Sequence, residues 1–258
     1  SKGRAIQNLI NIEQDDKVKA FICTKDLKDD EYINNHYVIM ATKRGQVKKT
    51  SLEQYSRPRV NGINAITIKE DDELLEAKLT DGNSQVMLAL KSGKAIRFEE
   101  AKTRPMGRNA SGVRGIRLQH DKDEVIGMVA VNDMESNILV VSSNGYGKRS
   151  RLEDYRITNR GGKGVKTISI TEKTGDLVAI KNVDDSNGLM IINKSGIAIR
   201  MAVEDLRVMG RATQGVKLIN IKDGDSIAAV AKVIHEKDED QHDEELESTE
   251  ENNTNSEQ

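Results

Sequence analysis

The feature that most constrains this chain is an internal repeat with a period of about fifty residues. Four segments each contain an apolar run, a polar turn with glycine, and a second run that carries basic residues: 36–52, 84–100, 137–152 and 188–203. The turn glycines, Gly45, Gly93, Gly145 and Gly196, are separated by 48, 52 and 51 residues. A fixed period of this size is typical of solenoids, propellers and arrays, in which one supersecondary unit is copied along the chain.

A glycine-led segment follows each of these hairpins at a nearly constant distance. Gly62, Gly112, Gly164 and Gly215 lie 17, 19, 19 and 19 residues after the preceding turn glycine, and they lead segments 61–69, 111–119, 163–171 and 214–222. An acidic turn and a further apolar stretch, such as 177–183 or 227–233, come next. Short apolar and β-branched runs bounded by Gly, Asn, Asp and Ser are typical of strands, so each unit is predicted to contain four strands.

The repeat predicts an all-β fold, a propeller-like disc of four-stranded units, because radial repetition limits the exposed edges of the sheets. The chain opens on a segment, 4–12, that matches the glycine-led strand of the repeat. We therefore expect about five blades, of which the first is incomplete. With two Phe, five Tyr and no Trp, aliphatic residues and Met must fill the core.

Charge divides the chain into two parts of opposite sign. The formal net charge is -2, but residues 236–258 hold eleven acidic residues and one lysine, so that segment carries -10 and residues 1–235 carry +8. The acidic segment has no apolar periodicity, which predicts a disordered tail. The expected organisation is a basic β domain over 1–235 followed by an acidic tail over 236–258.

Within the basic part, acids gather in the turns after the glycine-led segments, whereas bases gather in the hairpins and in the connections that follow them. Isolated surface cations are ordinarily solvated. Charged residues placed at random, however, would not separate into acidic and basic positions of the repeat. Units related by rotation would place equivalent cations on one rim, which suits a bent polyphosphate, and the scarcity of aromatics favours duplex over single-stranded DNA. The predicted rim residues are Lys43, Arg44, Lys48, Lys49, Lys91, Lys94, Arg97, Arg104, Arg108, Lys148, Arg149, Arg151, Lys194, Arg200 and Arg211.

The residue types required for several other functions are missing or scattered. Cys23 is the single cysteine and the four histidines are far apart, so no disulfide, no metal site and a reducing compartment are expected. No P-loop pattern occurs, and the five tyrosines lie in or beside predicted strands. The chain by itself is expected neither to cleave DNA nor to hydrolyse ATP. No apolar run approaches the roughly 18 residues of a membrane span, so no membrane partner is expected.

The phrases TKRGQVKKT, KSGKAIRF, NGYGKRS and MGRATQGV resemble the carboxy-terminal DNA-wrapping domain of the bacterial DNA gyrase A protein, over residues 1–235. The resemblance implies a β-pinwheel, a propeller relative whose blades exchange strands and whose basic rim wraps double-stranded DNA. It implies two protein partners, the rest of the gyrase A protein and the gyrase B protein. It also implies ATP and Mg as cofactors of the complete type II topoisomerase, none in this chain, and a bacterial cytoplasmic location at the nucleoid.

One segment is similar to a motif of that family, the gyrase-A box Q-[RK]-R-G-G-[RK]-G. Its last five positions are matched by Arg160, Gly161, Gly162, Lys163 and Gly164, whereas Thr158 and Asn159 differ from the first two. Adjacent glycines let a backbone approach a phosphate, and Arg and Lys add charge. The family's box lies in the first blade and this match lies later, so an auxiliary DNA contact is expected here, in a fragment of a longer protein or in a disc with fewer blades.

Two alternatives to a gyrase-like module remain open at this point. The first is the equivalent C-terminal domain of topoisomerase IV, which binds DNA without strong wrapping. The second is a non-catalytic propeller scaffold for acidic proteins. The box-like segment favours the gyrase type, and duplex binding would separate both nucleic-acid hypotheses from the scaffold.

The acidic tail generates the first testable prediction. A tethered segment of charge -10 competes with DNA for the basic part, so removal of residues 236–258 should tighten duplex binding at low salt, as measured by a gel-shift titration. Raising the salt should narrow the difference, because the competition is electrostatic. Equal affinities of the full and truncated chains at low salt would leave the tail with a solubilising role only.

Overall fold

The fold is built almost entirely from antiparallel strands. The computed structural model describes residues 16–222 and 224–234, which contain fifteen strands and one short α-helix, α1 (Asp30–Asn35). This part of the chain forms two compact units, each described by itself below. The first comprises the described residues up to Met134 together with Tyr155–Ile168, and the second comprises Glu135–Asp154 and the described residues from Ser169 onward.

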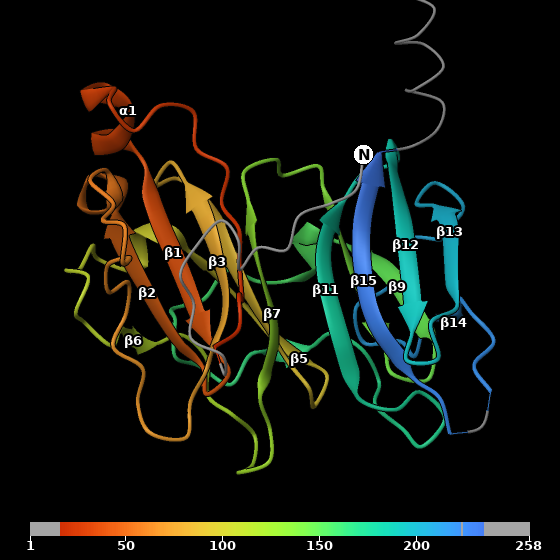
Figure 1. Ribbon diagram of the computed structural model, residues 1–258. Coiled ribbons are helices and arrows are strands. Elements are labelled where there is room, and N and C mark those ends of the chain that lie inside the picture. The colour runs from red at the N-terminus through yellow and green to blue at the C-terminus, as the bar shows by residue number, and fades with distance from the viewer. Residues whose placement is uncertain (1–15, 223, 235–258) are drawn as a thin grey trace, which may run out of the picture. The chain divides into compact units, whose positions relative to one another are not determined.

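The first unit contains two four-stranded sheets (Figure 1). Each is centred on one of the predicted hairpins, β1–β2 or β4–β5. One sheet has the order β3 (Leu74–Thr80), β1 (Tyr37–Thr42), β2 (Gln46–Ser51), β6 (Val113–Arg114). The other has the order β10 (Val165–Lys166), β5 (Lys94–Glu99), β4 (Gln85–Leu90), β7 (Val125–Val131).

The second unit contains the other two sheets, again centred on predicted hairpins. The first of them has the order β11 (Leu177–Val183), β8 (Asn137–Ser142), β9 (Tyr146–Arg151), β14 (Val216–Lys217). The last has three strands, β13 (Ala198–Ala202), β12 (Asn187–Asn193) and β15 (Ile227–Ile234), which lie side by side in Figure 1. The predicted all-β fold of hairpin-centred repeats is therefore confirmed, with three sheets of four strands and one of three in the described residues. The repeat segment at 4–12 and the tail at 236–258 lie outside the described residues.

The strands are exchanged between consecutive repeats. β6 follows the second hairpin in sequence, yet it pairs with β2 of the first hairpin through Gln46 and Val47. β10 and β14 pair in the same way with β5 and β9, the second strands of the preceding hairpins. Each of these three sheets is thus completed by a strand that belongs to the next repeat, which ties neighbouring repeats together through backbone hydrogen bonds.

The glycine-led strands are much shorter than the sequence predicts. Segment 61–69 contains no strand, and the other three contribute two residues each. After β6 the chain turns across the end of the first hairpin, where the amides of Gly115 and Ile116 both donate to the carbonyl of Gly45 (2.8 and 3.4 Å). The same pair of contacts joins Thr167 and Ile168 to Gly93. Because these amides bind a turn carbonyl, they cannot continue the ladder along the hairpin strand.

Three of the four acidic turns that follow the glycine-led segments hold a hairpin turn through an aspartate carboxylate. Asp72 accepts from the amide of Arg44 at 2.8 Å, and Asp123 accepts from both the amide and the hydroxyl of Ser92. Asp225 holds Ser195 in the same manner, and the hydroxyl of Ser195 helps to keep the pKa of that carboxyl below its ordinary value. The segregation of acids within the repeat therefore has a structural cause.

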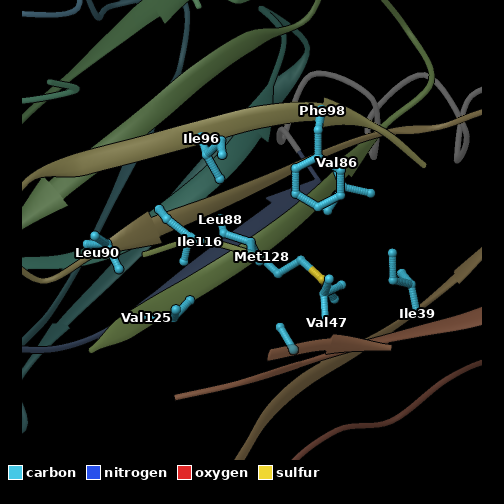
Figure 2. Packing of buried hydrophobic residues seen from close by; sticks show 11 residues of the cluster. Ile39, Val47, Val86, Leu88, Leu90, Ile96, Phe98, Ile116, Val125 and Met128 are labelled. Atoms are coloured by element: carbon cyan, nitrogen blue, oxygen red, sulfur yellow. The ribbon is translucent and has the colours of Figure 1, made fainter. Parts of the chain in front are cut away.

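Aliphatic side chains form the core of each unit, as the scarcity of aromatics predicts. In the first unit, buried residues of β1, β2, β4, β5 and β7 interdigitate, with the side chain of Met128 directed toward Val47 (Figure 2). Phe98 is fully buried in the same cluster. In the second unit, Leu139 and Val141 of β8 pack with Leu189 of β12 and further aliphatic residues. Both clusters join two sheets of the same unit.

The glycine at the start of each exchanged strand generates a stability prediction. Gly215 has a φ of +82° and a Cβ there would lie 2.5 Å from the carbonyl oxygen of Gly147, whereas Gly62 has a φ of +75° with nothing within 4 Å. Gly62→Ala should lower the free energy of unfolding by about 1 kcal/mol, because an alanine there must adopt a left-handed backbone conformation. Gly215→Ala must also displace the backbone of β9 and should cost at least ~2 kcal/mol more. Chemical denaturation measures both, and equal losses would contradict the close approach.

Candidate nucleic-acid interface

Two of the predicted rim lysines, Lys48 and Lys148, are fully buried. Lys48 donates to the carbonyl of Ala65 at 2.6 Å and also to that of Arg108, and Lys148 donates to the carbonyl of Gly210 at 2.5 Å. Burial, aided by neighbouring Arg108 or Arg211, lowers the pKa of each ammonium from 10.5 to about 8. Through Arg108 and Gly210 each lysine holds a connection of the following repeat, and through Ala65 Lys48 also holds segment 61–69 of its own repeat.

A buried cation also occupies the next position of each of three hairpins. Lys49 forms an ion pair with the buried Glu100 at 2.9 Å and lies over the ring of Tyr37. Arg97 donates to the carbonyl of Tyr155 at 2.9 Å, and Arg149 donates to that of Leu206 at 2.6 Å. Burial lowers the pKa of the Arg97 guanidinium below its ordinary value. Each arginine reaches from its own hairpin to the segment that follows the next hairpin.

These five residues, Lys48, Lys49, Arg97, Lys148 and Arg149, are the internal cations of the structure. Their charged groups are occupied by carbonyls and carboxylates, and each residue is at most 8% exposed. Removing a buried cation leaves its partners unsatisfied, so their role is to hold the structure together. Their assignment to the DNA-binding rim was wrong, because the packing of the repeats encloses these charges and no phosphate can reach them.

A second repeated arginine lies four residues before the glycine of each exchanged strand: Arg108, Arg160 and Arg211. Arg160 donates from Nε to the carbonyl of Lys102 at 3.1 Å, and Arg211 donates from Nε to that of Asp154 at 3.0 Å. The amide of Arg108 binds the side chain of Gln54. All three arginines are half-buried, so each contacts the preceding repeat and is also accessible to solvent.

The box-like segment is folded against the preceding exchanged strand. The amide of Gly161 donates to the carbonyl of Gly115 at 2.6 Å, and the carbonyl of Gly162 accepts from the amide of Arg117 at 2.8 Å. Gly164 occupies the position of Gly112 and Gly215, where a Cβ would meet the backbone of the hairpin, so its presence follows from strand exchange. Gly162 and Lys163 are exposed and form the surface of this segment.

The remaining predicted rim residues lie at or near the surface. Arg44, Arg104, Arg151, Lys194 and Arg200 are exposed, while Lys43, Lys91 and Lys94 are half-buried. Lys43 pairs with Glu73 and Lys94 donates to Gln119, so part of their charge is compensated locally. These residues, together with the three half-buried arginines and the box, form the candidate interface, and their contact with DNA stays a prediction.

A repeated cation of the exchanged strands lies outside the predicted rim set. The second residue of each exchanged strand is basic and exposed: Arg114, Lys166 and Lys217. The signal was present in the sequence, because each follows a glycine and a valine in the phrases GVR and GVK. Their repeated outward position adds them to the candidate interface.

The described residues contain neither a metal-ligand cluster nor a membrane-spanning helix. No group of three or more His, Cys, Asp or Glu side chains there is arranged to hold a metal ion. No helix in residues 16–222 and 224–234 is long and apolar enough to cross a membrane. The hydroxyl of the buried Tyr155 shares a 2.5 Å hydrogen bond with Thr167, which is the behaviour of a packing residue.

Four copies of one hairpin-centred unit, with strands exchanged between copies and repeated cations on the connections, define a β-propeller-like repeat domain. The family model described as DNA gyrase C-terminal domain, beta-propeller, matches residues 36–81, 86–132, 136–184 and 189–234. The chain belongs to this family. The four matched segments begin within two residues of the four hairpins, so the family repeat and the structural repeat are the same.

Two relatives show the extent of the similarity. The gyrase A protein of Staphylococcus epidermidis is 44% identical over 239 residues, which cover 92% of this chain and 26% of the relative. The gyrase A protein of Staphylococcus aureus is 43% identical over 245 residues, with 95% and 27% coverage. The chain therefore spans about a quarter of the length of the curated relatives it matches.

Solved structures share the fold. The C-terminal domain of DNA topoisomerase IV superposes with a TM-score of 0.82 at 24% identity, covering 90% of this chain and 71% of that one. A DNA gyrase A C-terminal domain superposes with a TM-score of 0.79 at 23% identity, covering 91% and 76%. Both comparisons confirm the architecture, and the family assignment comes from the sequence matches.

Lys148 generates a pH prediction. Its pKa is about 8 in the folded chain and 10.5 without burial, so above pH 8 the unfolded chain retains more protons than the folded one. The contribution of Lys148 to the free energy of unfolding should therefore rise as pH increases from about 8 to 10.5. Relative to Lys148→Met, the unmodified chain should gain about 1–2 kcal/mol between pH 7.5 and 9.5. Denaturation at both pH values measures this, and a constant difference would contradict it.

Proposed function

We propose that this domain binds duplex DNA through its repeated exposed cations. The observation that carries the proposal is the separation of the repeated cations into two sets. One set is buried and holds the repeats together, and the other, on the connections and exchanged strands, faces solvent at equivalent positions of three repeats. Arg104, Arg156 and Arg207 have no hydrogen-bond or ion-pair partner among the described residues, so their guanidinium groups are available to phosphates.

We propose further that the domain wraps the duplex as the C-terminal part of a DNA gyrase A protein. Repeated contacts at equivalent positions favour a bent duplex, and bending 20–30 base pairs by 40–90° costs on the order of 1–6 kcal/mol, which several phosphate contacts offset. Its partners would be DNA, the rest of the gyrase A protein and the gyrase B protein, in the bacterial cytoplasm. The complete enzyme would supply ATP, Mg and the cleavage tyrosine for negative supercoiling.

A topoisomerase IV protein is the second candidate, because its C-terminal domain has the same architecture. The relatives at 43–44% identity are DNA gyrase A proteins, which favours the gyrase hypothesis. The two candidates differ in wrapping, since a domain that binds without wrapping leaves the linking number of DNA unchanged. A scaffold for acidic proteins is a third hypothesis that predicts no duplex binding at all.

The test combines salt dependence with topology. If about eight phosphates are neutralised, the slope of log affinity against log salt should be near -7. When nicked circular DNA is religated with the domain bound, the linking number should shift in one direction. Gel-shift titrations and gel analysis of the religated circles measure the two quantities.

A matched control uses an internal and an exposed cation. Arg156→Gln should make the slope of log affinity against log salt shallower by about 1 and leave the unfolding midpoint unchanged. Lys148→Met should instead shift the unfolding midpoint. Binding with no linking-number shift points to the topoisomerase IV type. A flat salt response, or no duplex binding, defeats the proposal.

A further inference from the structure

Each of three connections carries an exposed apolar residue directly after the exposed arginine. The pairs are Arg104 and Pro105, Arg156 and Ile157, and Arg207 and Val208, and each begins 11 residues after the turn glycine of its repeat. Ile157 is 48% exposed and Val208 is 44% exposed. Ile157 and Val208 thus face solvent at the same position of two consecutive repeats, each directly after an exposed arginine.

The backbone fixes these apolar residues. Pro105, Ile157 and Val208 each form an isolated parallel bridge with an internal cation of the preceding hairpin. The amide of the residue that follows donates to the carbonyl of that cation, at 2.7 Å for Met106, 2.9 Å for Thr158 and 2.8 Å for Met209. The apolar side chains are therefore displayed from an anchored backbone, and little conformational entropy is lost when they meet a partner.

The arginines beside these apolar residues limit the kind of partner that can bind there. The apolar residue lies between two arginines of its connection, such as Arg156 and Arg160 around Ile157. An apolar protein surface would leave these guanidinium groups desolvated without a counter-charge, which is costly. Duplex DNA satisfies both requirements, because its phosphates border a groove whose walls are the carbon faces of the deoxyriboses.

Resting on the proposed binding of duplex DNA, we propose that Pro105, Ile157 and Val208 pack against deoxyriboses in the inward-facing minor groove, while the flanking arginines bind the phosphates. A duplex bent around a protein turns its minor groove inward about every 10 base pairs, and there an apolar side chain can meet the deoxyriboses while neighbouring arginines meet the phosphates. The contact favours a narrow groove, in which both walls lie close to one side chain, and A·T-rich tracts provide such a groove.

Salt dependence separates this apolar contact from phosphate binding. The double variant Ile157→Ser, Val208→Ser should bind duplex roughly fivefold more weakly per replaced side chain, with an unchanged slope of log affinity against log salt. Arg156→Gln should reduce the slope by about 1. Phe21→Ser is the matched control, because Phe21 is 78% exposed but lies outside the connections, and it should leave the affinity unchanged. Thermal unfolding of all variants should match that of the unmodified chain.

Groove occupancy tests the location of the contact. On an A·T-rich duplex whose minor groove is filled by a distamycin-type ligand, the difference between the unmodified chain and the double variant should disappear. A difference that persists there, a slope that changes in the double variant, or equal affinities on free duplex would each overturn the proposal. Failure of the unmodified chain to bind duplex would be a separate result, because it removes the proposed function before any variant is compared.

Discussion

The structure depends on cations that are removed from solvent and bound by the backbone of the next repeat. Lys48 and Lys148 donate to the carbonyls of Arg108 and Gly210 on the connections. Arg97 and Arg149 donate to the carbonyls of Tyr155 and Leu206. A buried ammonium or guanidinium is stable only where such partners satisfy it, so each connection is fixed by the charge beneath it. The exposed arginines on those connections take their positions from this buried layer.

One repeat therefore supplies cations for two purposes. The Lys and Arg side chains in the middle of the second hairpin strand are buried and bind neighbouring repeats. Those on the connections and exchanged strands are exposed to solvent. The carboxylates are divided in a similar way, because Asp72, Asp123 and Asp225 bind hairpin turns. An overall charge near zero is compatible with a strongly basic surface when the acids are engaged in turns or placed in a separate segment.

The repeat predicted the fold well, because the same pattern of apolar runs and turn glycines occurs four times along the chain. The hairpins lie where the turn glycines place them, and the aliphatic core is as expected. Two aspects depended on contacts between repeats and could not be derived from one unit. Segment 61–69 forms no strand, whereas each of the other three glycine-led segments forms a short strand by pairing with the hairpin of the preceding repeat. Lys48 and Arg104 both belong to the basic part of a repeat, but only tertiary packing separates the buried one from the exposed one.

Strand exchange also makes neighbouring repeats interdependent. A repeat encodes three strands of its sheet and receives the fourth from the repeat that follows, as the sheet of β1, β2 and β3 receives β6. Excision of one repeat would thus damage two sheets, its own and that of its predecessor. Repeats of this kind cannot be gained or lost singly without rebuilding a junction, whereas blades that complete themselves can. The blade number of such a domain is consequently a property of the whole array, resistant to stepwise change.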